Sequence, residues 1–285
     1  MTRANQSGRG SERGGAAPAG APQKYLLITS DDMGMCHAVN AGITRGMTEG
    51  VITSSTLMAP CPWFAQAVAL VKKHQLKVGI HLCLTCEWDH LRWGPLTRAS
   101  SLTGPDGYFW STIPDVVQSS RDEEIAAEFE AQVERVRTSG VEPTHIDIHM
   151  LSGDDNRHGV GRIREALRRC CRKHGLVYLR DENRGNGYEH LTDQIGSSGQ
   201  SEEAIWEALE GWTQPGFYHI IGHAAAAMPE LEAICSDDHP SRDWAAPYRL
   251  ADMVFFTRPA TRQRLAELGF QLVDVPTFLA LKQSA

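Results

Sequence analysis

The sequence predicts an α/β fold: one domain in which parallel strands form a closed or nearly closed barrel with helices outside it. Short runs rich in Ile, Leu and Val alternate with amphipathic runs from residue 25 onward, and such alternation is typical of a parallel sheet. The alternation repeats seven or eight times in 285 residues, enough for one barrel. The sequence contains no dinucleotide-binding or P-loop motif, which favours a barrel over an open nucleotide-binding sheet.

Seven strands are expected where short apolar runs are bounded by Gly, Pro or Asp. Each run is short enough for a strand and is separated from the next by a helix-like stretch or a loop. These strands cover residues 25–30, 52–59, 77–84, 144–150, 176–180, 216–223 and 271–275.

Six helices are expected between them, where apolar residues recur at helical spacing. Val39, Ile43 and Met47 lie on one face of the first helix, and three acidic residues open the helix that begins at residue 122, where they suit the helix dipole. Gly175 is suited to end the helix over residues 159–174. The helices cover residues 37–50, 63–74, 122–139, 159–174, 201–212 and 261–268.

Residues 85–118 form a long segment without a clear period, and it contains five aromatic residues. Long segments of this kind are more often functional than decorative. We expect exposed aromatic side chains that offer a binding platform, with Trp93 as the main candidate. The alternative is that the segment covers part of the core. Glu87, Trp88 and Arg92 are further candidates for substrate binding.

The ends and the composition of the chain exclude several classes of protein. Residues 1–23 are rich in Gly, Ala, Arg, Ser and Pro, and we expect a disordered tail, followed by one domain over residues 24–285. The tail lacks the apolar core of a secretory signal, and no run is long enough to span a membrane. Seven irregularly spaced cysteines indicate reduced thiols and a cytoplasmic protein. A net charge of −7 gives no basic footprint for nucleic acid.

Two adjacent carboxylates, Asp31 and Asp32, end the first expected strand, and Gly34 follows almost at once. Successive strand residues point to opposite faces, so the two carboxylates can take different roles, one binding a metal and the other handling protons. The alternative is an ordinary turn or helix N-cap, which aspartate also favours.

Histidines on three further strands favour the functional interpretation. His145, Asp147 and His149 share one face of the fourth strand, His81 lies in the third, and His223 ends the sixth. Polar groups on an inner face are unfavourable unless they are paired or metal-bound. His149 lies nearest the carboxyl end of its strand, where barrel active sites form, and is therefore a better ligand candidate than His145.

Carboxylates or histidines thus end four strands, and in a parallel barrel those ends converge on one mouth. One Asp and two His form a mixed ligand set for a divalent metal with open positions. Such a metal activates water and polarises a carbonyl group, while a carboxylate and a histidine can serve as base and acid.

The sequence resembles the YdjC-like (ChbG/YdjC) carbohydrate deacetylase family. The resemblance runs from about residue 25 to 281, and several motifs in the same order make it specific. The matching segments are residues 29–34, 53–58, 78–82 and 143–150, then His223 followed by 248–252, with 93–95 and 106–109 resembling one subgroup. The chain departs from the family pattern at Ile148, where serine is frequent, and at Ala224, where proline is common.

The resemblance implies a distorted TIM-like barrel that removes acetyl groups from N-acetylated sugars with one divalent metal ion. Carried over residue by residue, it makes Asp31 the general base and His223 the general acid. Asp32, His81 and a histidine of the 145/149 pair would bind the metal, and we expect His149. His145 and Asp147 would then lie behind the ligands.

Several features stay open at this stage. Softness of the ligands favours Zn²⁺, whereas the resemblance favours Mg²⁺. The expected partner is a small acetylated carbohydrate, with no nucleic acid and no membrane, and a homodimer is one open oligomeric state. Two alternatives compete with the deacetylase. One is a metal-dependent hydrolase of a phosphoester or another amide on the same barrel, and the other is a non-catalytic sugar-binding relative.

Overall fold

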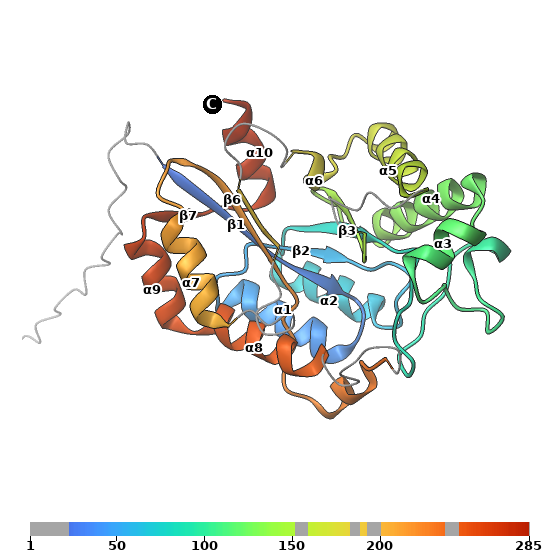
Figure 1. Cartoon of the computed structure of the whole chain (residues 1–285), viewed down its shortest axis with the longest axis horizontal. Coiled ribbons are helices and arrows are strands. Elements are labelled where there is room, and N and C mark those ends of the chain that lie inside the picture. Colours follow the sequence, from blue (N-terminus) through green and yellow to red (C-terminus); the bar gives the residue numbers. More distant parts are fainter. Residues whose placement is uncertain (1–22, 152–158, 183–188, 193–200, 237–244, 285) are drawn as a thin grey trace, which may run out of the picture.

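A parallel β-sheet runs through the centre of the molecule, and helices surround it (Figure 1). The computed structural model describes residues 23–151, 159–182, 189–192, 201–236 and 245–284, so the predicted tail, apart from residue 23, lies outside the described residues. The strands are β1 (Lys24–Met33), β2 (Ser54–Leu57), β3 (Val78–Leu82), β4 (Ile146–Ile148), β5 (Glu189–Thr192), β6 (Gly216–Gly222) and β7 (Phe270–Leu272).

The strands lie in the order β4-β3-β2-β1-β6-β5, with every pairing parallel, and β7 pairs with the first residues of β1. On the other side of β4, Tyr178 forms a parallel bridge with Ile146. Strands β1 to β4 therefore follow one another in chain order, as they do around a barrel, while β6 and the short β7 both pair with β1. Within the described residues, no pairing joins Tyr178 to β5. The parallel α/β fold is confirmed, and closure into a barrel stays a prediction.

Helices flank both sides of the sheet in Figure 1. Each amphipathic helix buries its apolar face, as α4 does with Ile125, Phe129 and Val133. The helices are α1 (His37–Thr48), α2 (Phe64–His74), α3 (Ile113–Ser119), α4 (Asp122–Thr138), α5 (Val160–His174), α6 (Leu179–Glu182), α7 (Glu202–Gly211), α8 (Ala245–Thr257), α9 (Pro259–Glu267) and α10 (Val275–Gln283). Two 3₁₀ helices, η1 (Ser100–Leu102) and η2 (Pro229–Ala233), complete the described elements.

Every helix predicted from apolar periodicity is present, with ends shifted by at most a few residues. One predicted strand is wrong. Over residues 176–180 only Tyr178 forms a bridge, and the chain turns into α6 at Leu179. The sequence prediction missed β5, α3, α6, α8 and α10.

The segment that follows β3 covers the core instead of presenting an aromatic platform. Trp88 and Trp93 are each 2% exposed and Phe109 is fully buried. The indole Nε1 of Trp93 donates a hydrogen bond to the backbone oxygen of Thr85 at 3.0 Å. Tyr108, at 41%, is the exposed exception. The expectation of exposed aromatics is therefore wrong, and the alternative, that this segment covers the core, describes the structure.

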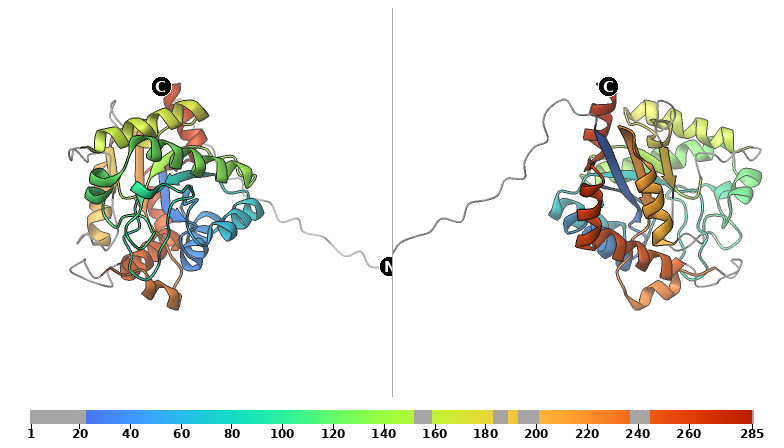
Figure 2. Two further views of the ribbon diagram at one scale, coloured as in Figure 1. Left: turned by 90° about the vertical axis from the view of Figure 1, so that its right-hand side faces the viewer. Right: turned by 60° about the vertical axis from the view of Figure 1, so that its left-hand side comes forward.

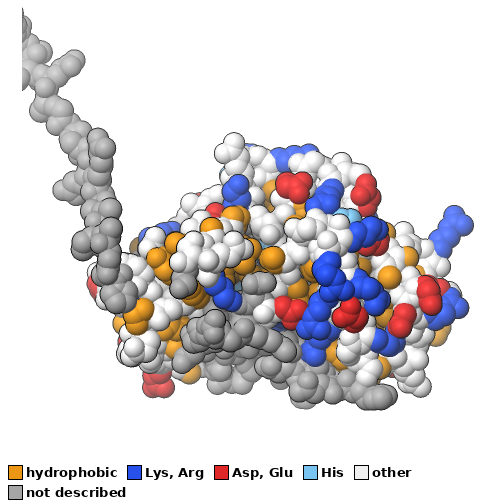
Figure 3. All heavy atoms as spheres, turned by 90° about the horizontal axis from the view of Figure 1, so that it is seen from above, with side chains coloured by type: hydrophobic (Ala, Val, Ile, Leu, Met, Phe, Trp, Pro, Cys, Tyr) orange, Lys and Arg blue, Asp and Glu red, His pale blue; other side chains and the backbone are white. Residues whose placement is uncertain are grey.

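Charged side chains of both signs intermingle over the face that carries α4 and α5 (Figure 3). Lys173 of α5 pairs with Glu130 of α4 at 2.8 Å, and Arg162 pairs with Asp122 at 2.5 Å. This face therefore offers no field of a single sign to a nucleic acid. All seven cysteines are free and buried. Among the described helices, none is both long enough and apolar enough to cross a bilayer.

Candidate metal and catalytic site

The carboxyl ends of the strands lie on the side that faces the viewer in the left-hand view of Figure 2. Three of these ends bring Asp32, His81 and His149 together from β1, β3 and the residue after β4. One ligand atom from each residue lies within 4.8 Å of the others. The side chains are at most 5% exposed. The structure thus groups the three residues that the sequence analysis named as metal ligands.

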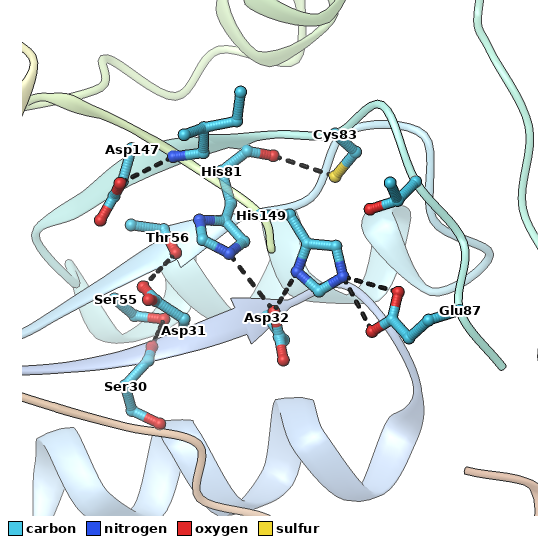
Figure 4. A network of polar contacts seen from close by, with 12 residues as sticks. Ser30, Asp31, Asp32, Ser55, Thr56, His81, Cys83, Glu87, Asp147 and His149 are labelled. Atoms are coloured by element: carbon cyan, nitrogen blue, oxygen red, sulfur yellow. Dashed lines mark hydrogen bonds and ion pairs between the residues drawn. The ribbon is translucent and has the colours of Figure 1, made fainter. Parts of the chain in front are cut away.

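The interatomic distances in this group suit a divalent cation. Oδ1 of Asp32 lies 3.5 Å from Nε2 of His81 and 3.2 Å from Nδ1 of His149, and both rings point toward it (Figure 4). Atoms bound to one Zn²⁺ or Mg²⁺ at about 2.0–2.2 Å lie about 3.0–3.5 Å apart. Oδ1 is buried between the two rings, and among the described residues no hydrogen bond of good geometry satisfies it. A cation between the three side chains would satisfy it.

Asp32 has an unusual backbone conformation, with φ of 75°, which non-glycine residues adopt rarely. The register between β1 and β2 also shifts between Ser30 and Met33, which marks a bulge in β1. Bulges near active sites re-aim side chains. The orientations of Asp31 and Asp32 therefore do not follow from the simple alternation that the sequence analysis assumed. Strain of this kind costs about 1–3 kcal/mol and is frequent at functional sites.

Arg249 of α8 holds the other oxygen of Asp32. A terminal nitrogen (NH2) of its guanidinium group lies 2.6 Å from Oδ2, and both side chains are 1% exposed. Burial alone would raise the pKa of Asp32, but Arg249 and His149 outweigh it and hold the pKa well below its usual range. Asp32 is thus a carboxylate with one oxygen fixed and the other directed at the two histidines.

His149 lies between two carboxylates. Its Nδ1 faces Asp32, and its Nε2 lies 2.9 Å from both oxygens of Glu87. Burial lowers the pKa of a histidine, but Glu87 and Asp32 together raise that of His149 well above its usual value. Glu87, which the sequence analysis considered for substrate binding, therefore contacts a predicted metal ligand.

Asp31 is 1% exposed and accepts a hydrogen bond from the hydroxyl of Thr56 at 2.6 Å. Burial, and then the negative charge of Asp147, raise its pKa to about 8. Asp147 itself pairs with Nε of Arg180 at 2.8 Å, and this pairing outweighs burial and lowers its pKa. Asp31 is therefore a protonatable carboxyl group in the same cluster as the metal candidates.

His223 follows β6, and its backbone N–H donates to Asp252 of α8 at 2.6 Å. Its ring packs edge-on against Tyr248 with centroids 5.7 Å apart. Burial lowers the pKa of His223 to about 3, although the charge of Asp32 opposes the shift. His223 and Asp32 therefore lie within electrostatic range of each other.

His145 lies apart from the cluster of ligands. It is fully buried, and Nδ1 lies 2.8 Å from the hydroxyl of Thr144. The ring rests on the backbone of Gly79, where a Cβ atom would come within 2.5 Å of it. Burial lowers the pKa of His145 to about 4. The structure therefore brings His149 into the metal group and leaves His145 behind it.

The remaining substrate candidates have structural partners. The Arg92 guanidinium group pairs with Asp106 at 2.8 Å and stacks over the ring of Tyr108. Trp93 packs against the ring of His149, with centroids 6.1 Å apart. A fully buried indole has no free face for a sugar ring, so the structure does not support Trp88 or Trp93 as a platform.

A second group, Glu130, Cys170 and His174, also has ligand atoms within 4.8 Å of one another. Here Nδ1 of His174 lies 3.0 Å from Arg137, which can only donate, so Nε2 carries the proton and donates to Glu130 at 2.7 Å. This tautomer offers no free lone pair to a metal. The group is better explained as an ion-pair network between α4 and α5.

Sequence reasoning missed the residues that support the site, above all Arg249, Thr56 and Arg180. Arg249 lies in a segment that matches the YdjC-like motifs, but its partner Asp32 is 217 residues away. Nothing in a single sequence predicts that contact.

An α/β fold in which parallel strands end at one Asp–His–His group defines a class of proteins with a candidate divalent-metal site. Within that class, a family model described as YdjC-like protein matches residues 25–267. The chain belongs to the YdjC-like family.

Two curated relatives are named carbohydrate deacetylase. The protein from Geobacillus stearothermophilus is 39% identical over 44% of this chain, and the chain spans about half of that relative's length, 49%. The protein from Halalkalibacterium halodurans is 31% identical over 70% of this chain and 84% of its own length. A crystal structure from Enterococcus faecalis V583, provisionally described as a cellobiose-phosphate cleavage protein, covers 90% of this chain and 99% of its own. Its TM-score is 0.74 at 24% identity, which supports the fold.

Proposed function

We propose that this protein is a metal-dependent carbohydrate deacetylase that hydrolyses the amide of N-acetylated sugars to release acetate. The observation that carries the proposal is the buried group of Asp32, His81 and His149 beside Asp31. Membership of the YdjC-like family and the names of the curated relatives support the same reaction.

Asp32, His81 and His149 would hold one divalent ion, Mg²⁺ or Zn²⁺. The buried Oδ1 of Asp32, which faces both histidines, and the ligand-to-ligand distances support this assignment. When bound, such a cation lowers the pKa of water and polarises the substrate carbonyl. Arg249 would keep Asp32 in its orientation throughout the reaction.

Asp31 would act as the general base and take a proton from the attacking water. Its pKa of about 8 in the metal-free chain reflects burial and neighbouring negative charge. A cation held by Asp32, His81 and His149 would favour the carboxylate form of Asp31, because an opposite charge nearby lowers the pKa of a carboxyl group. Asp31 would then be ionised when the substrate arrives.

His223 would act as the general acid and protonate the departing amine. With a pKa of about 3 in the metal-free chain, it is neutral near pH 7 and must take up a proton before it can donate one. The proton that Asp31 removes from water is available in the same cluster. His145 and Asp147 would support the ligands from behind.

The proposal also includes the extent of the domain, its closed shape, its partner and its environment. Residues 24–285 would form the deacetylase domain, with the strands closed into a distorted TIM-like barrel. The partner would be a small acetylated carbohydrate. Seven free, buried thiols support a reducing, cytoplasmic environment.

Acetate release from a panel of N-acetylated mono- and oligosaccharides tests the proposal, with purified protein in the presence and absence of a chelator. We expect release that the chelator abolishes and added Mg²⁺ or Zn²⁺ restores.

A generic phosphoester measured beside the sugars separates the alternatives. Phosphate release without acetate release would indicate a different hydrolase at the same site. Sugar binding without release of either product would indicate a non-catalytic relative. Release that is insensitive to the chelator would contradict the metal assignment.

A further inference from the structure

Glu87 has no assigned role in the deacetylation, yet its carboxylate lies directly behind a metal-ligand candidate. Both of its oxygens lie 2.9 Å from Nε2 of His149. The side chain of Glu87 is 11% exposed and that of His149 is 5% exposed. An ion pair this well buried is weakly screened by solvent and salt.

The contact determines which nitrogen of His149 can bind a metal. A carboxylate only accepts hydrogen bonds, so Nε2 must carry a proton. In the neutral ring with its proton on Nε2, the free lone pair is on Nδ1. Nδ1 is the atom that faces Oδ1 of Asp32, at 3.2 Å. The tautomer that Glu87 selects is therefore the one that directs a lone pair into the Asp32–His81–His149 group.

The surrounding segment fixes Glu87 in place. The residue before it, Cys86, donates its backbone N–H to Trp110 at 2.9 Å, and its sulfur accepts from the backbone N–H of Trp93 at 3.3 Å. The indole of Trp93 in turn packs edge-on against the ring of His149. Glu87 and His149 are thus largely buried together, and a hydrogen bond is stronger in such a low-dielectric environment than in water.

We propose that Glu87 is a positioning residue that sets the metal affinity of the site, by holding His149 with its proton on Nε2 and its Nδ1 toward the metal. Carboxylate partners of this kind orient a ligating histidine and raise its basicity, and their removal weakens metal binding about 10–100-fold. The inference rests on the metal site of the proposed function and assigns Glu87 to the protein's metal instead of the substrate.

The test measures the Kd for Zn²⁺ of the full-length, chelator-stripped protein by competition with a chromophoric chelator. The Zn²⁺ that the His149→Ala variant still binds measures binding at other places on the protein, and this amount is subtracted from the binding of each other variant. We expect Glu87→Ala to raise the Kd about 10–100-fold. Glu87→Gln should have an intermediate effect, because its amide oxygen still accepts from Nε2 but carries no charge. Glu49→Gln, the same change on an exposed surface pair, should leave the Kd unaltered.

A second readout addresses the tautomer directly. In the Zn²⁺-saturated protein with ¹⁵N-labelled histidine, nuclear magnetic resonance should show a proton retained on Nε2 of His149. Thermal unfolding of the metal-free variants separates lost folding from lost affinity.

The outcomes distinguish this inference from the proposed function. A Kd for Glu87→Ala within threefold of wild type, or a metal on Nε2, would overturn the role of Glu87 alone. The expected Kd series without acetate release would support Glu87 and overturn the deacetylase. A wild type that binds no metal would overturn both.

Discussion

Most buried charges around the site have a partner of opposite charge. Asp32 pairs with Arg249, and Asp147 pairs with Arg180. Asp31 differs, because it accepts its hydrogen bond from a neutral hydroxyl, that of Thr56. A buried carboxyl group without a cation resists ionisation, which explains its raised pKa. Asp31 is therefore the carboxyl group of the cluster whose protonation state responds most to an added cation.

Replacing Asp31 with asparagine tests the proposed base. The amide keeps the shape of the side chain but cannot accept a proton, so we expect kcat to fall about 10²–10⁴-fold. Metal content, measured by mass spectrometry of the purified protein, should stay at the wild-type level because Asp31 is not among the three grouped ligands. Full activity of this variant would remove Asp31 from the mechanism.

Replacing Arg249 with methionine tests the support of Asp32. The variant leaves a carboxylate buried without its guanidinium partner, and we expect the free energy of unfolding to fall by about 3–5 kcal/mol. Urea denaturation of the metal-free protein measures this. Metal affinity should fall as well, because Oδ2 of Asp32 is no longer fixed.

The matched control is Arg45→Met, which breaks an exposed pair with Glu49 and should cost less than about 1 kcal/mol. Adding Asp32→Asn to Arg249→Met should recover part of the lost stability, because the uncompensated charge is then gone. Equal costs for the two arginine variants would show that the buried pair contributes nothing.

At the residue scale, the position of a residue along its predicted strand indicated which side chains come together. The sequence selected His149 over His145 because His149 lies nearer the carboxyl end of its strand, and the structure groups His149 with Asp32 and His81. It could not predict Arg249 or the contact of Glu87, because both depend on segments brought together only by the tertiary fold.

At the scale of elements, the residue before β4 forms a pH-sensitive contact with β3, outside the group of metal-ligand candidates. His145 rests on Gly79 of β3 inside the sheet, and burial lowers its pKa to about 4 from an ordinary value of 6.5. The unfolded chain therefore binds a proton at this residue more readily than the folded chain does. The contribution of His145 to stability is fully present above pH 6.5 and is lost as the pH falls toward 4.

As the pH falls from 6.5 to 4, we expect protonation of His145 to lower the free energy of unfolding by up to about 1.4 kcal/mol for each pH unit. Urea denaturation of chelator-treated protein at several pH values gives the slope, and His145→Gln should make it shallower. His74→Gln, at an exposed position at the end of α2, is the control. An unchanged slope in His145→Gln would show that His145 does not contribute to acid lability.

Local apolar character misled the sequence prediction at one helix and at one strand. In α8, the run from Met253 to Phe256 has no polar residue, so no period of 3.6 residues is visible there. The strand expected over residues 176–180 had the right composition, but local apolar character cannot distinguish one bridge at Tyr178 from a full strand. Tertiary packing decided these cases.

At the scale of the whole molecule, the site depends on parts of the chain that are distant in sequence. Its residues come from β1, β3, the segment after β3, the end of β4 and α8. The unfolded chain cannot assemble this set of ligands. A metal ion that binds there binds only the folded state, and the binding free energy adds to the stability of the fold.

Metal removal should therefore lower the melting temperature of the whole protein. At a free metal concentration of 100 times the Kd, binding stabilises the folded state by about 2.7 kcal/mol. For a domain of this size each kcal/mol corresponds to about 2–4 °C, so we expect a shift of roughly 5–10 °C. Calorimetry of the wild type with Mg²⁺ or Zn²⁺, against the same protein with a chelator, measures it. Asp32→Ala and His149→Ala should melt at the same temperature in both conditions, whereas Glu49→Gln should keep the wild-type shift. A shift that survives in both ligand variants would mean that the stabilising ion binds elsewhere on the molecule.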